Sequence, residues 1–348
     1  IIIVCGDGEY DSNSPWSFSD YLAGQVYETA KARWFKDDKI TYLSSSGNPG
    51  VDGIPSGPSL LSAVSSASGI TKLTIYLVGK GSASAFDIDG DGWDSDDVIP
   101  SELDAALDAI QTSGDTFVIV ALDFTNSGAW VSPLQAPSGK DRIIITSCSG
   151  SESSWCEAGG AISFSRFFFS QIFTGRNIRD AFNWARAAVR GITGYTQNAQ
   201  LDDDGSGVSD GWDGALASVS YIGAAFVTGD DVPIITDYSK NIILSGSSEL
   251  LWASGVWDAD GISKVYAFIV KPGASSSSDE IVEVQLTYNA STGTWETSYS
   301  DFDPSRDYTV IYFAEDKNGQ LSEPYQTVFQ GVDNSDLYDR FHDDDFST

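Results

Sequence analysis

The segment 202–213 (DDDGSGVSDGWD) has the composition and spacing of a calcium-binding loop. Such a loop carries oxygen ligands at positions 1, 3, 5, 9 and 12, a glycine at position 6 for a sharp turn, and a backbone carbonyl ligand at position 7. Position 12 is Asp here instead of the usual bidentate Glu, which departs from the EF-hand pattern and suits a calcium loop of shorter reach. The predicted ligands are Asp202, Asp204, Ser206, Asp210 and Asp213, with the carbonyl of Val208 after the turn at Gly207.

A second acidic segment, 87–97 (DIDGDGWDSDD), begins in the same way. Its first ligand positions and its turn are Asp87, Asp89, Asp91 and Gly92, but the twelfth position is Val98. The shell would therefore be completed by Asp94, Asp96 or Asp97. Because a divalent cation offsets the repulsion among so many close carboxylates, the sequence predicts Ca2+ as the bound cofactor. The alternative for both segments is an ordinary solvated acidic turn.

The only histidine, His342, lies in an acidic segment near the end of the chain, so the rest of the sequence has no imidazole. Cys-His or Ser-His hydrolases and zinc enzymes of the usual kind need an imidazole in the same domain as the nucleophile or metal. Catalysis would have to use Lys, carboxylates, Ser or Thr, or a bound ion. A function without catalysis is therefore a serious alternative from the outset.

Three cysteines carry little further chemistry. Cys148 and Cys156 are eight positions apart and flank a turn, so a short disulfide loop is possible in an oxidising compartment, although spacing alone does not establish the geometry. Cys5 lies in an apolar strand and is expected to be a buried small hydrophobe.

Charge and composition restrict the partners. Fifty acidic against nineteen basic residues give a formal charge of −31, which repels nucleic acid and anionic lipid surfaces and attracts divalent cations. No apolar run approaches the roughly 20 residues of a membrane span. The sequence begins on an apolar strand without Met, as expected after removal of a secretory signal, so we expect an extracellular or cell-surface protein.

Apolar strands alternate with amphipathic helices in the region 1–229. The strands are rich in Val and Ile and apolar on both faces, which is typical of a parallel sheet covered by helices on both sides. We predict a doubly wound, mainly parallel α/β sheet, with functional groups at the carboxyl ends of its strands. The expected strands are 1–6, 39–45, 72–79, 116–122 and 142–147, and the expected helices are 16–35, 58–68, 101–112, 163–172 and 177–191.

The pattern changes to short alternating segments in the region 230–332, and turns of Gly, Asn, Ser and Asp separate them. This pattern predicts an antiparallel, immunoglobulin-like β-sandwich without a disulfide between its sheets. The segment 333–348 is interpreted as an acidic linker or tail. The expected strands of the sandwich are 241–256, 263–271, 280–287, 294–299, 307–315 and 324–330.

Two strand ends carry a family resemblance. One strand ends in 75–81 (IYLVGKG), and another ends in 120–128 (VALDFTNSG). The chain resembles the legumain-like branch of the caspase and gingipain clan of cysteine peptidases, whose strands end in an apolar run before His-Gly and in Asp-Ala-Cys-x-Ser-Gly. The resemblance continues through the segments 142–147, 159–169 and 197–204, and the downstream sandwich resembles the β-domain of bacterial members.

At the two catalytic positions the chain departs from this family. The resemblance puts Lys80 at the position of the histidine and Thr125 at that of the nucleophilic cysteine. Lysine is an ammonium near neutral pH unless it is deeply desolvated, and threonine is a poor nucleophile without a base. The framework residues Gly79, Asp123 and Ser127 are retained. A kept framework with a replaced dyad predicts a pseudo-enzyme.

Tryptophans in or beside these loops, Trp93, Trp130, Trp155 and Trp212, either pack over the end of the sheet or form contact anchors for another subunit. We therefore expect a non-catalytic, calcium-stabilised structural or interaction subunit that self-assembles as a homo-oligomer, with a surface layer or filament as candidate forms. Two alternatives remain: a residual peptidase that uses Thr125 and Lys80, and a pseudo-enzyme that binds peptide in the old cleft without cutting it.

Overall fold

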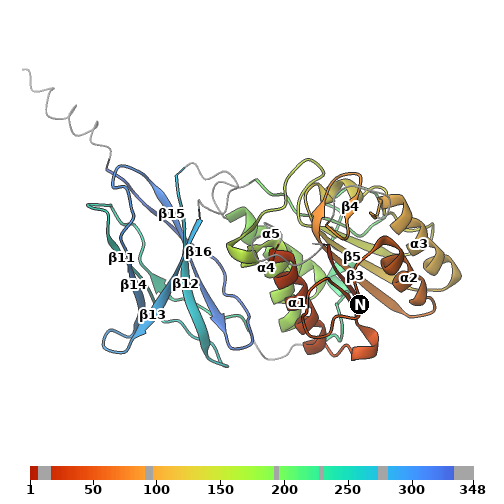
Figure 1. Ribbon diagram of the computed structural model, residues 1–348, viewed down its shortest axis with the longest axis horizontal. Coiled ribbons are helices and arrows are strands. Elements are labelled where there is room, and N and C mark those ends of the chain that lie inside the picture. Colours follow the sequence, from red (N-terminus) through yellow and green to blue (C-terminus); the bar gives the residue numbers. More distant parts are fainter. Residues whose placement is uncertain (7–16, 91–96, 192–195, 227–230, 273–280, 333–348) are drawn as a thin grey trace, which may run out of the picture. The chain divides into compact units, whose positions relative to one another are not determined.

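The computed structural model describes residues 1–6, 17–90, 97–191, 196–226, 231–272 and 281–332. The chain forms two compact units, one built mainly from residues up to 226 and the other mainly from residues 231 onward (Figure 1). No helix in the described ranges is long and apolar enough to cross a membrane. The two units are described separately.

The first unit contains a mainly parallel sheet, as predicted. Its strands follow the order β2-β1-β3-β5-β6-β9, with β4 paired to the end of β3. All neighbouring pairs are parallel except β6 with β9 and β3 with β4. The strands are β1 (Ile2–Gly6), β2 (Thr41–Leu43), β3 (Lys72–Gly81), β4 (Phe86–Asp87), β5 (Phe117–Asp123), β6 (Arg142–Thr146) and β9 (Gln200–Asp202), beside a separate small pair, β7 (Cys156–Glu157) and β8 (Ile162–Ser163).

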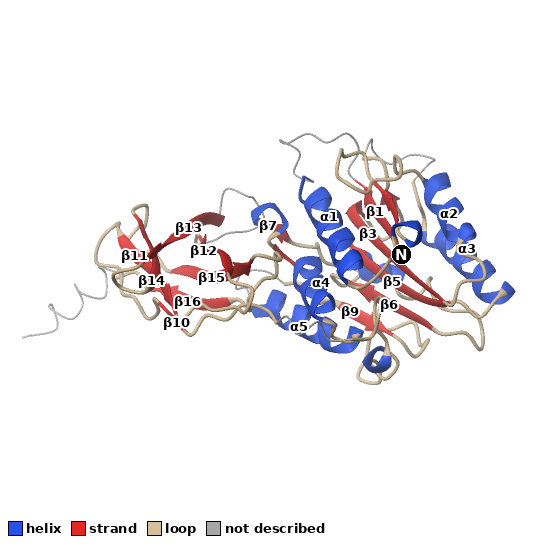
Figure 2. Ribbon diagram, turned by 90° about the horizontal axis from the view of Figure 1, so that it is seen from below, coloured by secondary structure: helices blue, strands red, loops and turns tan. Residues whose placement is uncertain are grey.

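Helices cover both faces of this sheet, which explains why its strands are apolar on both sides. In Figure 2, α1 and α4 lie over one face, and α2 and α3 lie over the other. Short 3-10 turns lie at Asp37–Lys39, Ser127–Trp130, Ala158–Gly160 and Ala217–Val219. The five α-helices are α1 (Ser17–Ala32), α2 (Gly57–Ser66), α3 (Pro100–Ser113), α4 (Phe164–Thr174) and α5 (Ile178–Gly191).

Local signals fix where these helices begin and end. The Ser56 hydroxyl accepts a hydrogen bond from the backbone N–H of Ser59, and the Ser59 hydroxyl accepts one from Ser56 N–H, forming a capping box at the start of α2. Ser163 caps α4 in the same position by accepting from Arg166 N–H. Helix α4 ends at Gly175, whose φ of 96° suits glycine.

A hydrophobic core fills the space between the sheet and the layer of α2 and α3. Leu60, Val64, Leu103 and Leu107 from the helices meet inward side chains of β1, β3, β5 and β6, all almost fully buried. On the opposite face, the rings of Tyr76 on β3 and Phe169 on α4 meet edge to face, 4.9 Å apart. Burial on both faces makes the carboxyl ends of the strands rigid supports for the loops that follow them.

The named strands of the second unit pair with one another in antiparallel fashion, so the predicted all-β character is confirmed within the described ranges. Its sheet has the order β10-β11-β14-β13-β12-β15-β16. Strand β13 pairs with β12 through residues 281–286 and with β14 through residues 287–289, so this one strand joins the two halves. The strands are β10 (Asp237–Tyr238), β11 (Glu249–Ser254), β12 (Ile262–Val270), β13 (Ile281–Asn289), β14 (Thr294–Tyr299), β15 (Tyr308–Asp316) and β16 (Tyr325–Phe329).

The alternation read from the sequence sets the inner face of this unit. Val265, Ala267 and Ile269 on β12, and Val310 and Tyr312 on β15, are buried in a common core. The strand expected at 241–256 is shorter than predicted: β11 covers Glu249–Ser254, whereas Leu244 N–H donates to the carbonyl of Gln330 beside β16. The alternation of apolar residues could not show that this segment has two different partners, β14 for residues 249–254 and Gln330 for Leu244.

Candidate functional site

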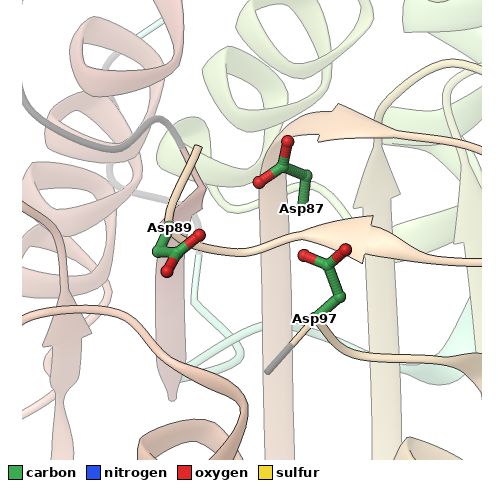
Figure 3. Close-up of side chains that lie close together, drawn as sticks. All are labelled: Asp87, Asp89 and Asp97. Carbon is green, nitrogen blue, oxygen red and sulfur yellow. The ribbon is translucent and has the colours of Figure 1, made fainter. Parts of the chain in front are cut away.

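Three carboxylates meet at the carboxyl end of β3. Asp87, Asp89 and Asp97 each offer an oxygen, and these oxygens lie within 4.8 Å of one another (Figure 3). Asp87 is fully buried and Asp97 is 8% exposed. This group joins the beginning of the predicted acidic segment 87–97 to its end. Of the other predicted ligands, Asp91, Asp94 and Asp96 lie outside the described residues, as does Trp93.

A short hairpin explains how these residues come together. Ser82 N–H donates to the carbonyl of Ala85 at 2.8 Å, and the returning strand β4 pairs with the end of β3. Phe86 and Val98 then exchange backbone hydrogen bonds of 2.8 and 3.1 Å, which brings Asp97 back beside β4. The acidic loop is therefore closed by strand pairing at its base.

A lysine supplies positive charge to the first carboxylate group. Lys80 and Asp87 are directly paired across β3 and β4, and Lys80 Nζ donates to Asp87 Oδ2 at 2.6 Å. The other oxygen, Oδ1, accepts from Gly90 N–H at 2.9 Å. The Lys80 side chain is 31% exposed, whereas the Asp87 side chain is fully buried. An ammonium held in this way neutralises part of the charge of the loop.

The second predicted loop also gathers three carboxylates. Oxygens of Asp202, Asp204 and Asp213 lie within 4.8 Å of one another. Asp202 is 1% exposed at the end of β9, whereas Asp204 is exposed. Carboxylate oxygens are the ligands that calcium prefers, so both groups fit this cation chemically.

Other predicted ligands of this loop form turns within it. Asp210 is outside the group of three, and its Oδ1 accepts from Trp212 N–H at 2.7 Å. The hydroxyl of Ser206 donates to the carbonyl of Val208 at 3.0 Å. The structure therefore brings together three of the six predicted ligands and gives the other three internal contacts.

Asp203, which the calcium spacing leaves unused, anchors this loop. Its two carboxylate oxygens accept from Gly214 N–H at 2.8 Å and from Ala217 N–H at 2.7 Å. Asp213 accepts in turn from Asp203 N–H at 3.2 Å and from Asp210 N–H at 2.6 Å. The ends of the loop are thus tied together by carboxylate hydrogen bonds to the backbone.

The electrostatics of this loop are unfavourable for charged carboxylates. Burial raises the pKa of Asp213 to about 6, against hydrogen bonds from the backbone of Asp210 and Asp203 that lower it, and the charges of Asp202 and Asp204 raise it further. Burial likewise raises the pKa of Asp202, against hydrogen bonds from Gly205 and Gly207. A divalent cation would offset both effects.

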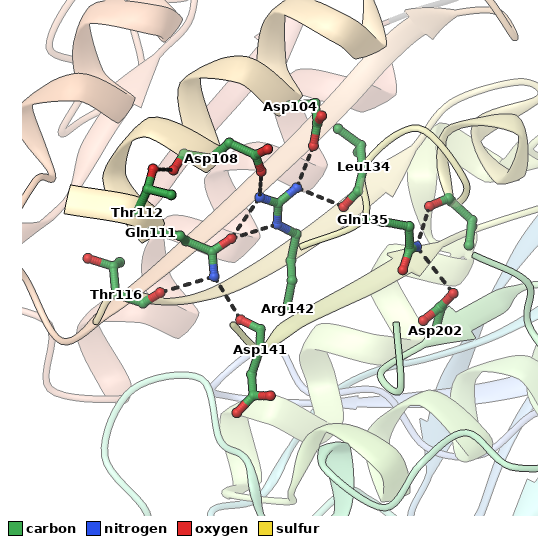
Figure 4. A network of polar contacts seen from close by, with 11 residues as sticks. Asp104, Asp108, Gln111, Thr112, Thr116, Leu134, Gln135, Asp141, Arg142 and Asp202 are labelled. Carbon is green, nitrogen blue, oxygen red and sulfur yellow. Dashed lines mark hydrogen bonds and ion pairs between the residues drawn. The ribbon is translucent and has the colours of Figure 1, made fainter. Parts of the chain in front are cut away.

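A buried arginine network supports this group from the side of β6 (Figure 4). Arg142 donates to Asp104 and Asp108, each at 2.8 Å, to Gln111 Oε1 and to the carbonyl of Leu134. Burial raises the pKa of Asp104, against the hydrogen bond from Arg142. The neighbouring Gln135 donates from Nε2 to Asp202 Oδ2 at 3.2 Å. The second carboxylate group therefore has a neutral amide, that of Gln135, as its neighbour. The first group has the ammonium of Lys80 in the corresponding role.

The two groups lie at opposite ends of the sheet. Lys80 and Asp87 follow the carboxyl end of β3. Strand β9 is antiparallel to β6, with Asp202 opposite Ile144, so the loop after Asp202 extends toward the amino ends of the parallel strands. The rule that function gathers at carboxyl ends thus applies to the first group only.

Lys80 and Thr125, to which the resemblance assigns the catalytic positions, lie near the ends of neighbouring strands. Val78 on β3 pairs with Asp123 on β5, and Lys80 and Thr125 each follow this pair by two residues. Thr125 is half-buried, and no hydrogen bond to its hydroxyl is found within the described part of the chain. Lys80, the amine that the resemblance places opposite Thr125, donates a hydrogen bond to Asp87 instead.

Aromatic rings pack beneath these strand ends. The rings of Phe86 and Phe124 lie 5.2 Å apart, as do those of Phe124 and Trp130, and all three side chains are almost fully buried. Trp130 Nε1 donates to the carbonyl of Ser82 at 2.9 Å. A Cβ on Gly81 would lie 2.2 Å from the ring of Phe124, so only glycine permits this packing. The residue before Thr125 therefore belongs to the core.

Asp123, one of the residues that match the resemblance, connects β5 to the segment that follows β6. Asp123 Oδ2 accepts from Ser165 N–H at 3.3 Å, and Oδ1 accepts from the hydroxyl of Ser154 at 2.5 Å. That serine accepts from the hydroxyl of Ser147 at 2.9 Å. Asp123 is 3% exposed, so its carboxylate ties β5 to the segment after β6. These contacts give the retained residues a structural explanation.

The disulfide that the spacing allowed is not formed: Cys148 and Cys156 are not bonded to each other in this structure. The buried Cys148 thiol lies 3.4 Å from the Ser127 hydroxyl and 3.3 Å from the carbonyls of Phe124 and Glu152. Burial raises its pKa, although hydrogen bonds from Ser127 oppose this. Cys5 is buried in β1, as predicted.

The tryptophans differ in exposure. Trp130 packs in the core, Trp155 is half-buried, and Trp212 is 83% exposed in the loop after Asp210. His342 and the rest of the segment 333–348 lie outside the described residues.

Comparisons with known proteins add no family. No protein-family model and no curated protein matches the chain. One solved structure it matches is a cycloalternan-degrading enzyme from Trueperella pyogenes in complex with isomaltose, at 16% identity over 25% of this chain and 11% of that enzyme, with a TM-score of 0.20. Another is a fungal alcohol oxidase of the AA5 family in complex with copper, at 11% identity over 32% of this chain and 22% of that chain, also with a TM-score of 0.20. Likenesses this partial carry no argument about fold or function.

Proposed function

We propose that this chain is a non-catalytic structural or interaction subunit built on a peptidase-like scaffold and stabilised by calcium. In this proposal the first unit is a caspase-like domain of the legumain-like branch and the second is an immunoglobulin-like sandwich. The observation that carries it is the contact between Lys80 Nζ and Asp87 Oδ2 at 2.6 Å, at the position where the resemblance puts the catalytic histidine.

The charge state of this contact argues against catalysis. An ammonium that donates to a buried carboxylate has no lone pair with which to accept the proton of Thr125. Removing that proton from the ammonium would leave the Asp87 carboxylate buried without its counter-charge. Thr125 follows Phe124, which is packed in the core, and lacks the orienting base that a hydroxyl nucleophile requires.

Calcium would stabilise the scaffold at two loops. Asp202, Asp204 and Asp213 offer converging carboxylates, and burial together with the charges of its two neighbours raises the pKa of Asp213, which favours a bound cation. The first group, around Asp87, already has the charge of Lys80 and should bind calcium more weakly. Thermal melts in calcium and in chelator test this, because a ligand that binds only the folded state raises the melting temperature. An unchanged melting temperature would remove both assignments.

Self-assembly outside the cell is the use that we assign to this scaffold. The formal charge of −31 disfavours nucleic acid and anionic membranes as partners, and the exposed aromatic Trp212 offers a contact anchor. Sedimentation velocity in calcium and then in chelator tests the assembly. A strict monomer in both conditions would contradict it and leave the scaffold without its proposed use.

A further inference from the structure

A polar pocket in the first unit lies between α5 and the second acidic loop. Its volume is about 190 Å³, the size of a site for one side chain and not for a long ligand. One wall is a stripe of α5 at helical spacing, namely Arg179, Phe182, Asn183 and Arg186. The opposite wall comes from Leu201 and from residues 209–211, 213 and 214.

Among the described residues, no carboxylate forms an ion pair with Arg179 or Arg186. Within the described ranges, Arg186 donates to Asn183 Oδ1 at 3.1 Å and lies over the ring of Phe182, and Arg179 forms no hydrogen bond. Burial, and then the nearby Arg190, lower the pKa of Arg186. Unpaired guanidinium groups are unusual in a chain with 50 acidic and 19 basic residues, where carboxylate partners are abundant.

The acidic residues of the opposite wall are directed to the backbone. Asp210 accepts from Trp212 N–H, and Asp213 accepts from Asp203 N–H and Asp210 N–H. A Cβ on Gly214 would lie 2.8 Å from Arg179 Cδ, so the absence of a side chain there leaves room for the arginine stem. The guanidinium groups therefore remain available to an external anion.

The geometry points to a site for a carboxylate side chain of an acidic peptide, and we propose that its occupant is the segment 333–348 (DNSDLYDRFHDDDFST) of a second copy. This segment carries six aspartates together with Tyr338, Phe341 and Phe346. Trp212 and Val208, 83% and 56% exposed beside the pocket, offer apolar surface to such aromatics. Arginine binds carboxylates through parallel N–H donors.

This inference rests on the self-assembly proposed above and names a contact that would produce it. The test uses a fluorescently labelled peptide of residues 333–348, titrated with the full chain and followed by fluorescence anisotropy. Arg186→Glu should weaken peptide binding by roughly tenfold or more, because it replaces a charged donor by a repelling carboxylate. Lys36→Glu is the matched control: it makes the same charge change in the first unit, at an exposed residue outside the pocket lining, and should change binding by about twofold at most.

Further arms identify the ligand chemistry. A peptide with its six aspartates replaced by asparagine should not bind, and inorganic phosphate at the peptide concentration should not displace the acidic peptide. Equal weakening by Arg186→Glu and Lys36→Glu, binding of the neutral peptide, or displacement by phosphate would each overturn the proposal. Arg179→Glu, at an exposed position, is a second pocket variant, and circular dichroism establishes that each variant is folded.

Sedimentation of the same variants separates this inference from the proposed function. If the chain assembles and Arg186→Glu disrupts assembly while Lys36→Glu does not, both proposals stand. If assembly occurs equally in all variants, self-assembly stands and the pocket contact is wrong. If the chain is monomeric but binds the peptide through Arg186, the pocket stands as a peptide site and self-assembly is wrong.

Discussion

Lys80 Nζ donates to Asp87 Oδ2 at 2.6 Å, and the two residues face each other across the short hairpin of β3 and β4. The pair joins a strand end that would carry a catalytic base to a loop that would carry a cation. One ammonium thus affects both kinds of chemistry: it occupies the place of a base and supplies positive charge to an acidic loop. The predictions below follow from this pair and from its counterpart in the second loop.

Replacing Lys80 by Met should destabilise the protein in chelator. The change leaves the fully buried Asp87 carboxylate without its ammonium, at a cost of about 2 kcal/mol, which allows for the partial exposure of Lys80. Added calcium should recover more stability in this variant than in the wild type, since the loop has lost its internal cation. Chemical denaturation with and without calcium measures both effects.

Lys140→Met is the matched control for that variant. Lys140 pairs with Asp115 at 2.7 Å, but the Asp115 side chain is 99% exposed. The loss should be much smaller than for Lys80→Met and independent of calcium, as for other exposed ion pairs. Equal losses in the two variants would show that burial of Asp87 contributes nothing.

In the second loop, Asp204→Asn should abolish most of the calcium-induced rise in melting temperature without lowering stability in chelator. Asp204 is exposed and contributes repulsion to Asp202 and Asp213 when no cation is bound. Asp203→Asn should behave in the opposite way and destabilise both states, because it disturbs hydrogen bonds to Gly214 and Ala217. Calorimetry of the two variants in calcium and chelator distinguishes a ligand from an anchor.

The raised pKa of Asp213 predicts an unusual pH dependence in chelator. The folded value is about 6 against an ordinary 3.8, so ionisation at neutral pH costs stability, and this cost decreases as the pH falls below 6 and is lost only below about 3.8. Asp213→Asn should therefore be more stable than the wild type at pH 7.5, by about 1 kcal/mol after allowance for solvent screening. The difference should decrease below pH 6 and vanish only below about pH 4. Denaturation across this pH range tests it, and a difference that grows on acidification would contradict the assignment.

Much of this fold could be predicted from the sequence, because long apolar runs such as those of β3, β5 and β6 are typical of strands covered on both faces. The strands β4 and β9, of two and three residues, were missed since runs this short have no detectable period. Yet β4 creates the pairing of Lys80 with Asp87, which spacing along the chain did not indicate.

The candidate sites were predicted in part for the same reason. Loop spacing identified Asp202, Asp204 and Asp213, whose positions depend on local turns. It did not identify Gln135 as the amide neighbour of Asp202, because that contact spans 67 positions and depends on the arginine network beside β6. Nor did it identify the pocket of Arg186, which combines a helix face with a distant loop.

The reactivity of the cysteines tests how tightly the residues around Thr125 are packed. Burial raises the pKa of Cys148, so its reactive thiolate should form only above the pH of ordinary thiols. At pH 8, iodoacetamide should label the half-buried Cys156 first and leave Cys148 and Cys5 protected until the protein unfolds. Mass spectrometry of the labelled peptides measures the order. Rapid labelling of Cys148 in the folded protein would show that the strand end is open.

The central claim, that the dyad positions no longer catalyse peptide hydrolysis, is tested most directly by peptidase assays on the wild type and Thr125→Ala. Both proteins are incubated with fluorogenic peptide libraries, with and without calcium. We predict that both give the same background rate in every condition, since Lys80 is bound to Asp87 and no base is available to the Thr125 hydroxyl. Turnover by the wild type that is lost in Thr125→Ala would contradict this account and show that the chain is an active peptidase.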